Sequence, residues 1–349
     1  MTEHDPFDGA TTPLKVVAIG GGTGMPGVLR GMRELVDARE PANLTAIVTM
    51  ADDGGSSGRL RKHRGMLPPG DVRNCLVAMS AEQDLLAGLF QHRYDGGEEL
   101  DGHNLGNLIL TALAEQTGSF MKAVEVSSRV LRTVGRILPV TVDDVRLTAT
   151  TVCGRQVEGE SAINDCSDAI KRVALVPSTV RPAEGVVEAI MEADLVALGP
   201  GSLYTSLLPN IAMAEVAKAL RETHAVRVLV GNLVQERGES PELGLGGHID
   251  AVNEHAGGSI VDALLVHDGE IPQEIRERYR EQGSEPCGLP DEATCSVRLV
   301  RRPLLKPRDK KLRHDPNATA EGLLAAWNEL HQLRTREDGN ATLAGQAAD

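Results

Sequence analysis

The segment KVVAIGGGTGMPG, residues 15–27, decides the fold class, because an apolar run stops abruptly at a cluster of glycines. The run at 15–19 predicts a buried strand, and apolar residues at helical spacing over 25–38 predict a helix. A second apolar run, LTAIVTM at 44–50, predicts another strand. A strand, a helix and a strand within about 35 residues form a βαβ unit, which requires a parallel sheet and a right-handed crossover.

The same alternation of strands and helices returns in the second half of the chain, with strands expected at 193–199, 226–232 and 261–267. Between the two halves, residues 71–132 are mostly helical in pattern, and residues 146–161 alternate with period two around a Gly-Arg turn, which predicts a β-hairpin. The sequence therefore predicts an α/β fold: a doubly wound, Rossmann-like parallel sheet with helices on both faces and a small β subdomain.

No linker interrupts this pattern, so we expect a single domain over residues 14–335. The polar ends of the chain, 1–13 and 336–349, lack periodicity and are expected to be disordered.

Composition limits the classes of function. A net charge of −14 disfavours nucleic acid as the main partner, because binding a polyanion requires a broad basic face. No apolar run is long enough to span a membrane, and the acidic start does not resemble a signal peptide. The five cysteines are scattered without a CxxC pair, which indicates reduced thiols in a cytoplasmic protein.

Two glycine-rich turns follow predicted strands and precede helices. The first contains Gly21, Gly22, Thr23 and Gly24, and the second contains Gly199, Gly201, Ser202 and Tyr204. Such turns bring backbone N–H groups and a helix N-terminus against a phosphate. Ligands of open parallel sheets bind outside the carboxyl ends of the strands, where both turns are expected, so the pair indicates a nucleotide site.

The loop ADDGGSSGRLR, residues 51–61, follows the strand at 44–50. Asp52 and Asp53 occupy the place where a dinucleotide fold holds a ribose, and they are also candidate ligands of Mg²⁺. Because adjacent side chains diverge, only one of the two need reach a ligand. The same loop offers hydroxyls and positive charge for a phosphate through Ser56, Ser57, Arg59 and Arg61.

Two helix entries have the same polar character. In PPGDVRN, residues 68–74, Asp71 is the expected N-cap, and Arg73 and Asn74 lie in the first turn. In GHNLGN, residues 102–107, Asn104 is the expected cap, flanked by His103 and Asn107. For Asp71, capping and ligand binding are equally good explanations, and for His103 so are a structural role and a ligand contact.

Taken in order, GGGTG, VTMADDGGSSGRLR, PPGDVRN, GHNLGNL, LGPGSLYTS and LRHD resemble the YvcK-type gluconeogenesis factors. These form a branch of the superfamily that includes 2-phospho-L-lactate transferase, CofD. The resemblance covers about residues 15–330. It implies a cytoplasmic protein that binds a UDP-sugar such as UDP-N-acetylglucosamine and supports cell-wall and cell-shape homeostasis on gluconeogenic carbon. It also makes Asn232, Tyr279 and Arg313 candidate ligand contacts. A homo-oligomer and a cell-wall regulatory protein are both candidate partners, and the sequence leaves this choice open.

One loop departs from the family pattern. In GNLVQERGESPELGLGGHID, residues 231–250, only Asn232, Gly238, Glu239 and His248 align with it. The sequence shows no general base placed against an acceptor, so a binding protein is preferred to a transferase that uses magnesium and a nucleotide-linked donor. A nicotinamide dehydrogenase fits less well, because the triple glycine and the Asp-Asp-Gly-Gly loop depart from its fingerprint.

Overall fold

A computed structural model describes residues 14–36, 43–81, 85–97, 99–235, 243–281, 284–293, 295–305 and 312–346, and the side chains up to 336. The expected disorder of residues 1–13 lies outside this range, as do Gly238 and Glu239.

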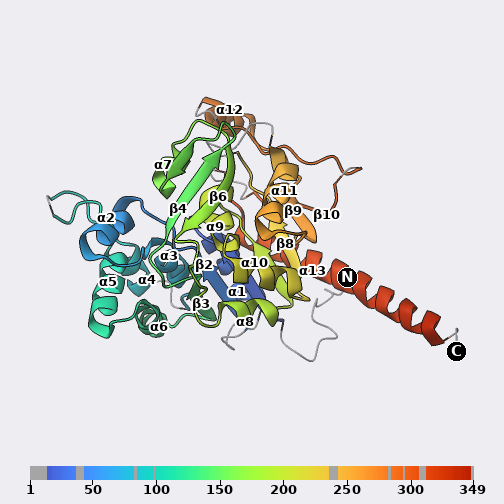
Figure 1. Cartoon of the computed structure of the whole chain (residues 1–349), viewed down its shortest axis with the longest axis horizontal. Helices are drawn as coiled ribbons and strands as arrows, with labels where there is room; N and C mark the ends of the chain where they lie inside the picture. The colour runs from blue at the N-terminus through green and yellow to red at the C-terminus, as the bar shows by residue number, and fades with distance from the viewer. Residues whose placement is uncertain are drawn as a thin grey trace.

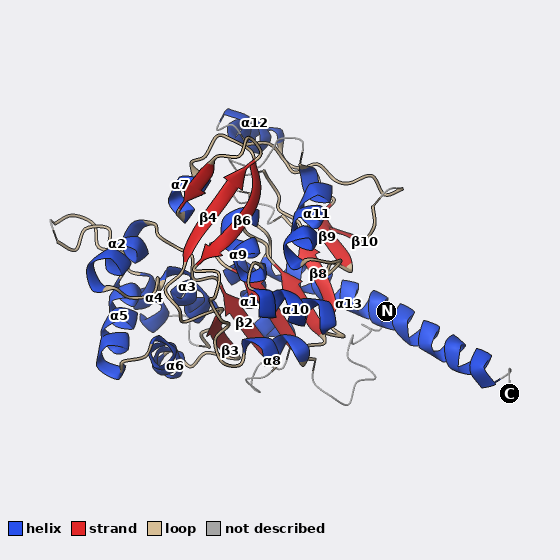
Figure 2. Cartoon of the chain, viewed as in Figure 1, coloured by secondary structure: helices blue, strands red, loops and turns tan. Residues whose placement is uncertain are grey.

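The core of the molecule is a seven-stranded, all-parallel sheet in the order β10-β9-β8-β7-β1-β2-β3 (Figures 1 and 2). Its central strand β1, Val16–Gly20, pairs with β2, Leu44–Val48, on one side and with β7, Leu195–Leu198, on the other. The remaining strands are β3 (Arg136–Pro139), β8 (Val226–Val230), β9 (Ala263–His267) and β10 (Arg298–Arg302). The winding direction reverses between β1 and β7, so the crevice at their carboxyl ends is the expected ligand site.

Helices cover both faces of this sheet, as the sequence predicts. On one face lie α1 (Met25–Leu35), α3 (Gly70–Ala78) and α13 (Pro316–Gln346). On the other lie α8 (Val186–Met191), α9 (Leu208–Ile211), α10 (Ala214–Glu222) and α11 (Gly244–Ala256). Every residue of β1, β2 and β7 is buried, which explains why these strands read as continuous apolar runs rather than as alternating patterns.

A group of helices lies beside the end of the sheet that carries β2 and β3 (Figure 1). It consists of α2 (Gly55–Arg64), α4 (Leu85–Gln91), α5 (Leu105–Thr117) and α6 (Phe120–Val130), and it confirms the helical pattern seen over 71–132. A separate short helix, α12, spans Gln273–Glu281. No helix in the described part of the chain is long and apolar enough to cross a membrane.

The predicted hairpin is present and is larger than expected. Strands β4 (Arg146–Thr151) and β5 (Gln156–Glu158) are antiparallel, and β6 (Ile170–Val176) adds a third strand on the other side of β4. The short helix α7, Glu160–Asn164, connects β5 to β6. This small sheet lies above the carboxyl edge of the large one (Figure 1), so the β subdomain borders the crevice.

Two elements differ from the sequence-based expectation. The helix expected after the second glycine turn is broken into a π-helical turn, Leu203–Leu207, then α9 and α10. Pro209 is the second residue of α9, two residues after the π turn ends, and a proline cannot donate the backbone hydrogen bond of a regular helix interior. At the C-terminus α13 continues to Gln346, into the range 336–349 where disorder was predicted, although Gly339, Asn340 and Gly345 are poor helix formers.

Candidate functional site

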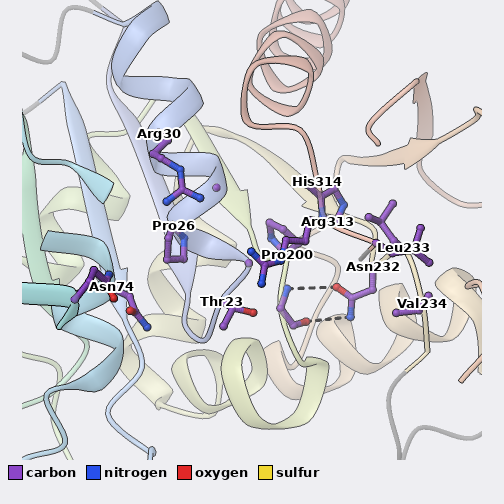
Figure 3. Close-up of a pocket in the computed structure, with 15 residues that line it drawn as sticks. Thr23, Pro26, Arg30, Asn74, Pro200, Asn232, Leu233, Val234, Arg313 and His314 are labelled. Atoms are coloured by element: carbon purple, nitrogen blue, oxygen red, sulfur yellow. Dashed lines mark hydrogen bonds between the residues drawn. The ribbon is translucent and has the colours of Figure 1, made fainter. Parts of the chain in front are cut away.

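A cavity of about 310 Å³ opens between the two glycine turns, at the point where the sheet reverses its winding (Figure 3). Its walls come from the turn after β1 and helix α1, the turn after β7, the segment after β8 and the segment before α13. The residues that line it are Thr23, Gly24, Pro26, Gly27, Arg30, Asn74, Gln91, Pro200, Gly201, Asn232, Leu233, Val234, Leu312, Arg313 and His314. Segments nearly 300 residues apart in the chain therefore form one polar pocket.

Close approach of neighbouring atoms explains two glycines of the first turn. A Cβ on Gly24 would lie 2.5 Å from the carbonyl oxygen of Pro200, and one on Gly21 would lie 2.4 Å from Thr49 Cγ2. The Asn232 side chain then joins the ends of β7 and β8, because Nδ2 donates to Gly201 O at 3.0 Å and Oδ1 accepts from Gly201 N at 3.3 Å (Figure 3). The two turns are thus packed against each other rather than held apart by solvent.

Gly24→Ala is expected to destabilise the chain by about 1–3 kcal/mol, because its Cβ would push the first turn away from Pro200. Gly27→Ala is the matched control on the same helix, since a Cβ there meets nothing within 4 Å. Replacing a helical glycine by alanine stabilises by roughly 0.5–1 kcal/mol. Urea unfolding of both variants measures the difference, and equal stability of the two would contradict the packing of the turns.

Positive charge gathers on one wall of the cavity. The Arg30 and Arg313 side chains reach it from α1 and from the segment before α13 (Figure 3). Burial, Arg33 and Arg313 lower the pKa of Arg30, and among the described residues no carboxylate pairs with either guanidinium. The chain as a whole has a net charge of −14, so two adjacent guanidiniums without a carboxylate partner among the described residues are unusual in it. Their position beside the cavity indicates an anion site.

The segment that carries Arg313 is fixed by its neighbours. The Tyr279 hydroxyl accepts a hydrogen bond from Leu312 N at 3.1 Å, and His314 Nε2 donates to Gly231 O at 3.1 Å. Burial lowers the pKa of His314 to about 4, so the ring is neutral at pH 7 and acts as a hydrogen-bond donor rather than as a cation. Tyr279 does not line the cavity but contacts the backbone next to Arg313.

The acidic loop lies next to the first glycine turn, and its two aspartates accept hydrogen bonds from different segments. Asp52 Oδ1 accepts from Gly54 N at 2.9 Å, whereas Asp53 Oδ1 accepts from Ser161 N at 2.9 Å and from Ser161 Oγ at 2.7 Å. Asp53 therefore supplies an acceptor for the first turn of α7, a structural contact that the sequence did not predict.

Asp71 is not the N-cap of its helix, contrary to expectation. The cap is Pro69, and Asp71 is the second residue of α3. Its Oδ2 accepts from Gly22 N at 2.8 Å, so the carboxylate anchors the first glycine turn instead of closing its own helix. That Gly22 N–H is consequently already occupied.

The carboxyl groups near this loop have perturbed pKa values. Burial, reinforced by Asp52, raises the pKa of Asp71 to about 6, and burial with Asp52, Asp71 and Asp53 raises that of Glu160 to about 9. Burial also raises the pKa of Asp52. Carboxyl groups with raised pKa values are common at functional sites, although none of these three lines the cavity.

The Asp52 and Asp53 pair does not fit a magnesium ion. Their carboxylates turn to different elements, Asp52 toward Gly54 and Asp53 toward α7. Within the residues that the structure describes, no group of three or more His, Cys, Asp or Glu side chains is arranged to hold a metal ion.

The second helix entry behaves as predicted at its cap. Asn104 Oδ1 accepts from Asn107 N, which makes Asn104 the N-cap of α5, and Asn104 Nδ2 donates to Gln91 O. His103 Nδ1 lies 3.1 Å from Ser56 Oγ, so this histidine has a partner inside the protein. Ser57 Oγ accepts from Gly70 N, which links the acidic loop to α3.

The structure brings only part of the predicted set to the cavity: Thr23, Gly24, Asn74, Gly201, Asn232 and Arg313 line it. A second group forms the adjoining polar network: Asp52, Asp53, Ser56, Ser57, Asp71, Arg73, His103, Asn104 and Asn107. Arg59 and Arg61 lie outside the cavity, because Arg59 donates to Asp101 O and Arg61 pairs with Asp144.

Arg30, Gln91 and His314 line the cavity and were missed. For Arg30 the sequence did contain a signal. Gly27 and Arg30 are three residues apart in a helix that begins at Met25, so they lie on the same side of it, next to the glycine turn.

Comparison with known proteins decides the family. The family model described as 2-phospho-L-lactate transferase CofD matches residues 16–305. The chain belongs to the CofD family. The gluconeogenesis factor of Bacillus subtilis is 39% identical over 317 residues, which cover 90% of this chain and 98% of that protein. The gluconeogenesis factor of Listeria monocytogenes is 37% identical, over 90% of this chain and 96% of that protein.

A solved structure of a CofD-family relative confirms the fold. The crystal structure of a protein from Bacillus halodurans aligns with a TM-score of 0.85 at 39% identity, covering 90% of this chain and all of that one. Within the CofD family the chain is therefore related to the gluconeogenesis factors, as the sequence motifs predict.

Proposed function

We propose that this chain is a regulatory protein that binds a nucleotide-sugar, with the diphosphate held in the cavity between the two glycine turns. The observation that carries the proposal is the pair of guanidiniums on the cavity wall, Arg30 and Arg313, which no carboxylate of the described residues neutralises. Arginine recognises phosphate through paired, charge-assisted hydrogen bonds. The cavity of about 310 Å³ is lined by more polar than apolar groups, which suits a phosphorylated sugar better than an apolar cofactor.

Helix termini support the same placement. Helix α1 begins at the first turn with neither a side-chain cap nor an acidic residue in its first turn, so the positive end of its dipole is not neutralised from within. Thr23, Gly24 and Gly201 present the nearest backbone and hydroxyl groups to the cavity. The ligand we propose is a UDP-sugar. The family resemblance implies UDP-N-acetylglucosamine in particular.

On this proposal, the protein acts in the cytoplasm as a sensor of nucleotide-sugar supply. Relatives at 37% and 39% identity are named gluconeogenesis factors. A sensor of nucleotide-sugar supply would link growth on gluconeogenic carbon to cell-wall synthesis and cell shape, through a homo-oligomer or a regulatory protein partner.

A thermal-shift panel tests the ligand class with UDP-N-acetylglucosamine, GDP, NAD and ATP, each with and without magnesium. A ligand at 100 times its dissociation constant stabilises by about 2.7 kcal/mol, which is readily measured. We expect the uridine nucleotide-sugar to give the largest shift. A shift with NAD alone would contradict the proposal.

The alternative is a CofD-type transferase, and one observation favours it. Asp71 lies beside the first glycine turn with a pKa of about 6, close to the value that suits a general base at neutral pH. Turnover of a nucleotide-linked donor in the presence of an acceptor would support this reading, and binding without turnover would support the regulatory one.

A further inference from the structure

Two of the five cysteines, Cys153 and Cys166, lie together at the far end of the small β sheet. Cys153 is in the turn between β4 and β5, and Cys166 follows α7. The backbone brings the two segments side by side, because Val152 N donates to Ala169 O at 2.8 Å. The segments that carry the two thiols are therefore adjacent at the end of the β4–β6 pairing.

Asp168 and Arg155 connect these two sulfur atoms. Cys153 Sγ donates to Asp168 Oδ2 at 3.7 Å, and Arg155 Nε donates to the same oxygen at 2.9 Å. Arg155 Nη2 in turn lies 3.0 Å from Cys166 Sγ, which also approaches Asp168 O at 3.6 Å. Each sulfur thus has a different polar neighbour: a carboxylate that can accept a proton and a guanidinium that stabilises negative charge.

We propose that Cys153 and Cys166 are an oxidative modification site, a thiol pair that hydrogen peroxide converts to an intramolecular disulfide. Cys153 is exposed and Cys166 is buried, so Cys153 is the thiol that peroxide reaches first. The Cys153 proton passes to Asp168, and the sulfur attacks one peroxide oxygen, which gives a sulfenic acid and hydroxide. The Cys166 sulfur, beside the Arg155 guanidinium, then attacks the Cys153 sulfur, the S–O bond of the sulfenic acid breaks to release a second hydroxide, and this hydroxide takes up the Cys166 proton.

Protons returned to the two hydroxide ions make two waters, so one peroxide is reduced and two thiols are oxidised. At Cys75, burial and Asp71 raise the thiol pKa well above its usual value, which makes that sulfur a poor nucleophile.

The modification has a structural consequence that does not depend on which ligand the cavity binds. Helix α7 ends at Asn164, two residues before Cys166, and Asn164 Oδ1 accepts from Thr205 Oγ1 at 3.0 Å. The start of the same helix is held by Asp53. A disulfide at Cys166 would therefore restrain a helix that contacts both the acidic loop and the segment after the second glycine turn.

Peptide mapping of the full chain tests the proposal. The reduced protein is treated with hydrogen peroxide, free thiols are blocked, and peptides are separated without reductant. We expect one cross-linked pair, Cys153 with Cys166, while Cys75, Cys287 and Cys295 are recovered as blocked thiols. A link between other cysteines, separate oxidation of Cys153 and Cys166 to sulfinic acids, or no reaction at either would overturn it.

Four variants assign the roles within the pair. Cys166→Ser is expected to accumulate a sulfenic acid at Cys153 that dimedone traps, whereas Cys153→Ser should give no trapped product at Cys166. Arg155→Gln should slow disulfide formation at least about tenfold by removing the charge beside Cys166, with partial rescue by Arg155→Lys. An unchanged rate in Arg155→Gln would show that the guanidinium does not act on Cys166.

Discussion

Arg30→Gln and Arg313→Gln are each expected to weaken binding of UDP-N-acetylglucosamine by roughly 10- to 100-fold, and the double variant should show no measurable binding. A hydrogen bond to a charged group contributes about 1.5–3 kcal/mol, which corresponds to this range of affinity. Titration calorimetry of the two single variants and the double variant gives the dissociation constants.

Stability separates this effect from unfolding. Arg30 is repelled by Arg33 and Arg313, so its replacement by glutamine should leave the melting temperature unchanged or slightly higher. Arg129→Gln is the matched control, since it removes the same charge from an exposed position on α6, away from the cavity. If Arg129→Gln weakened binding as much as Arg30→Gln, the effect would reflect net charge rather than the cavity.

Asp71→Asn is expected to make the protein more stable than the wild type above pH 6 by about 1–3 kcal/mol. The folded-state pKa of Asp71 is raised from 3.8 to about 6, so the folded chain binds this proton more tightly than the unfolded chain does. The resulting stabilisation is present below pH 4 and is lost as the pH rises through about 6. The amide keeps an oxygen to accept from Gly22 N without the repulsion from Asp52.

Asp71→Ala is the companion variant, because it removes both the charge and the acceptor. Relative to Asp71→Asn, it leaves Gly22 N–H without its partner, which lowers the free energy of unfolding by roughly 1–3 kcal/mol at every pH. Urea unfolding of the wild type and both variants between pH 4 and pH 8 measures the difference. Equal stability of the wild type and Asp71→Asn at pH 8 would contradict a strained carboxylate at this position.

Hydrophobic pattern alone predicted the sheet, because parallel strands buried on both faces must be apolar throughout. Strands β1, β2, β7, β8 and β9 were all expected within two residues of their ends. The edge strands β3 and β10 were not expected. β10 reads RLVRR, and its arginines obscure the apolar pattern of a strand that is only partly buried.

The candidate site was predicted in outline, because both glycine turns follow strands and parallel strands meet at one edge. What the sequence could not give is the partner of each polar side chain. Asp71 could be taken for a helix cap until the structure placed its carboxylate on Gly22 N, 49 residues away. Asp53 likewise bonds Ser161, which is 108 residues away, and such contacts have no local pattern.

The central claim is that an anionic nucleotide-sugar lies between the two glycine turns, and a crystal structure of the complex with UDP-N-acetylglucosamine tests it most directly. The account predicts density for the diphosphate within hydrogen-bond distance of both Arg30 and Arg313, beside Gly24 and Gly201. Density for the ligand at the basic helix α2, or against the acidic loop with both arginines turned to solvent, would contradict it.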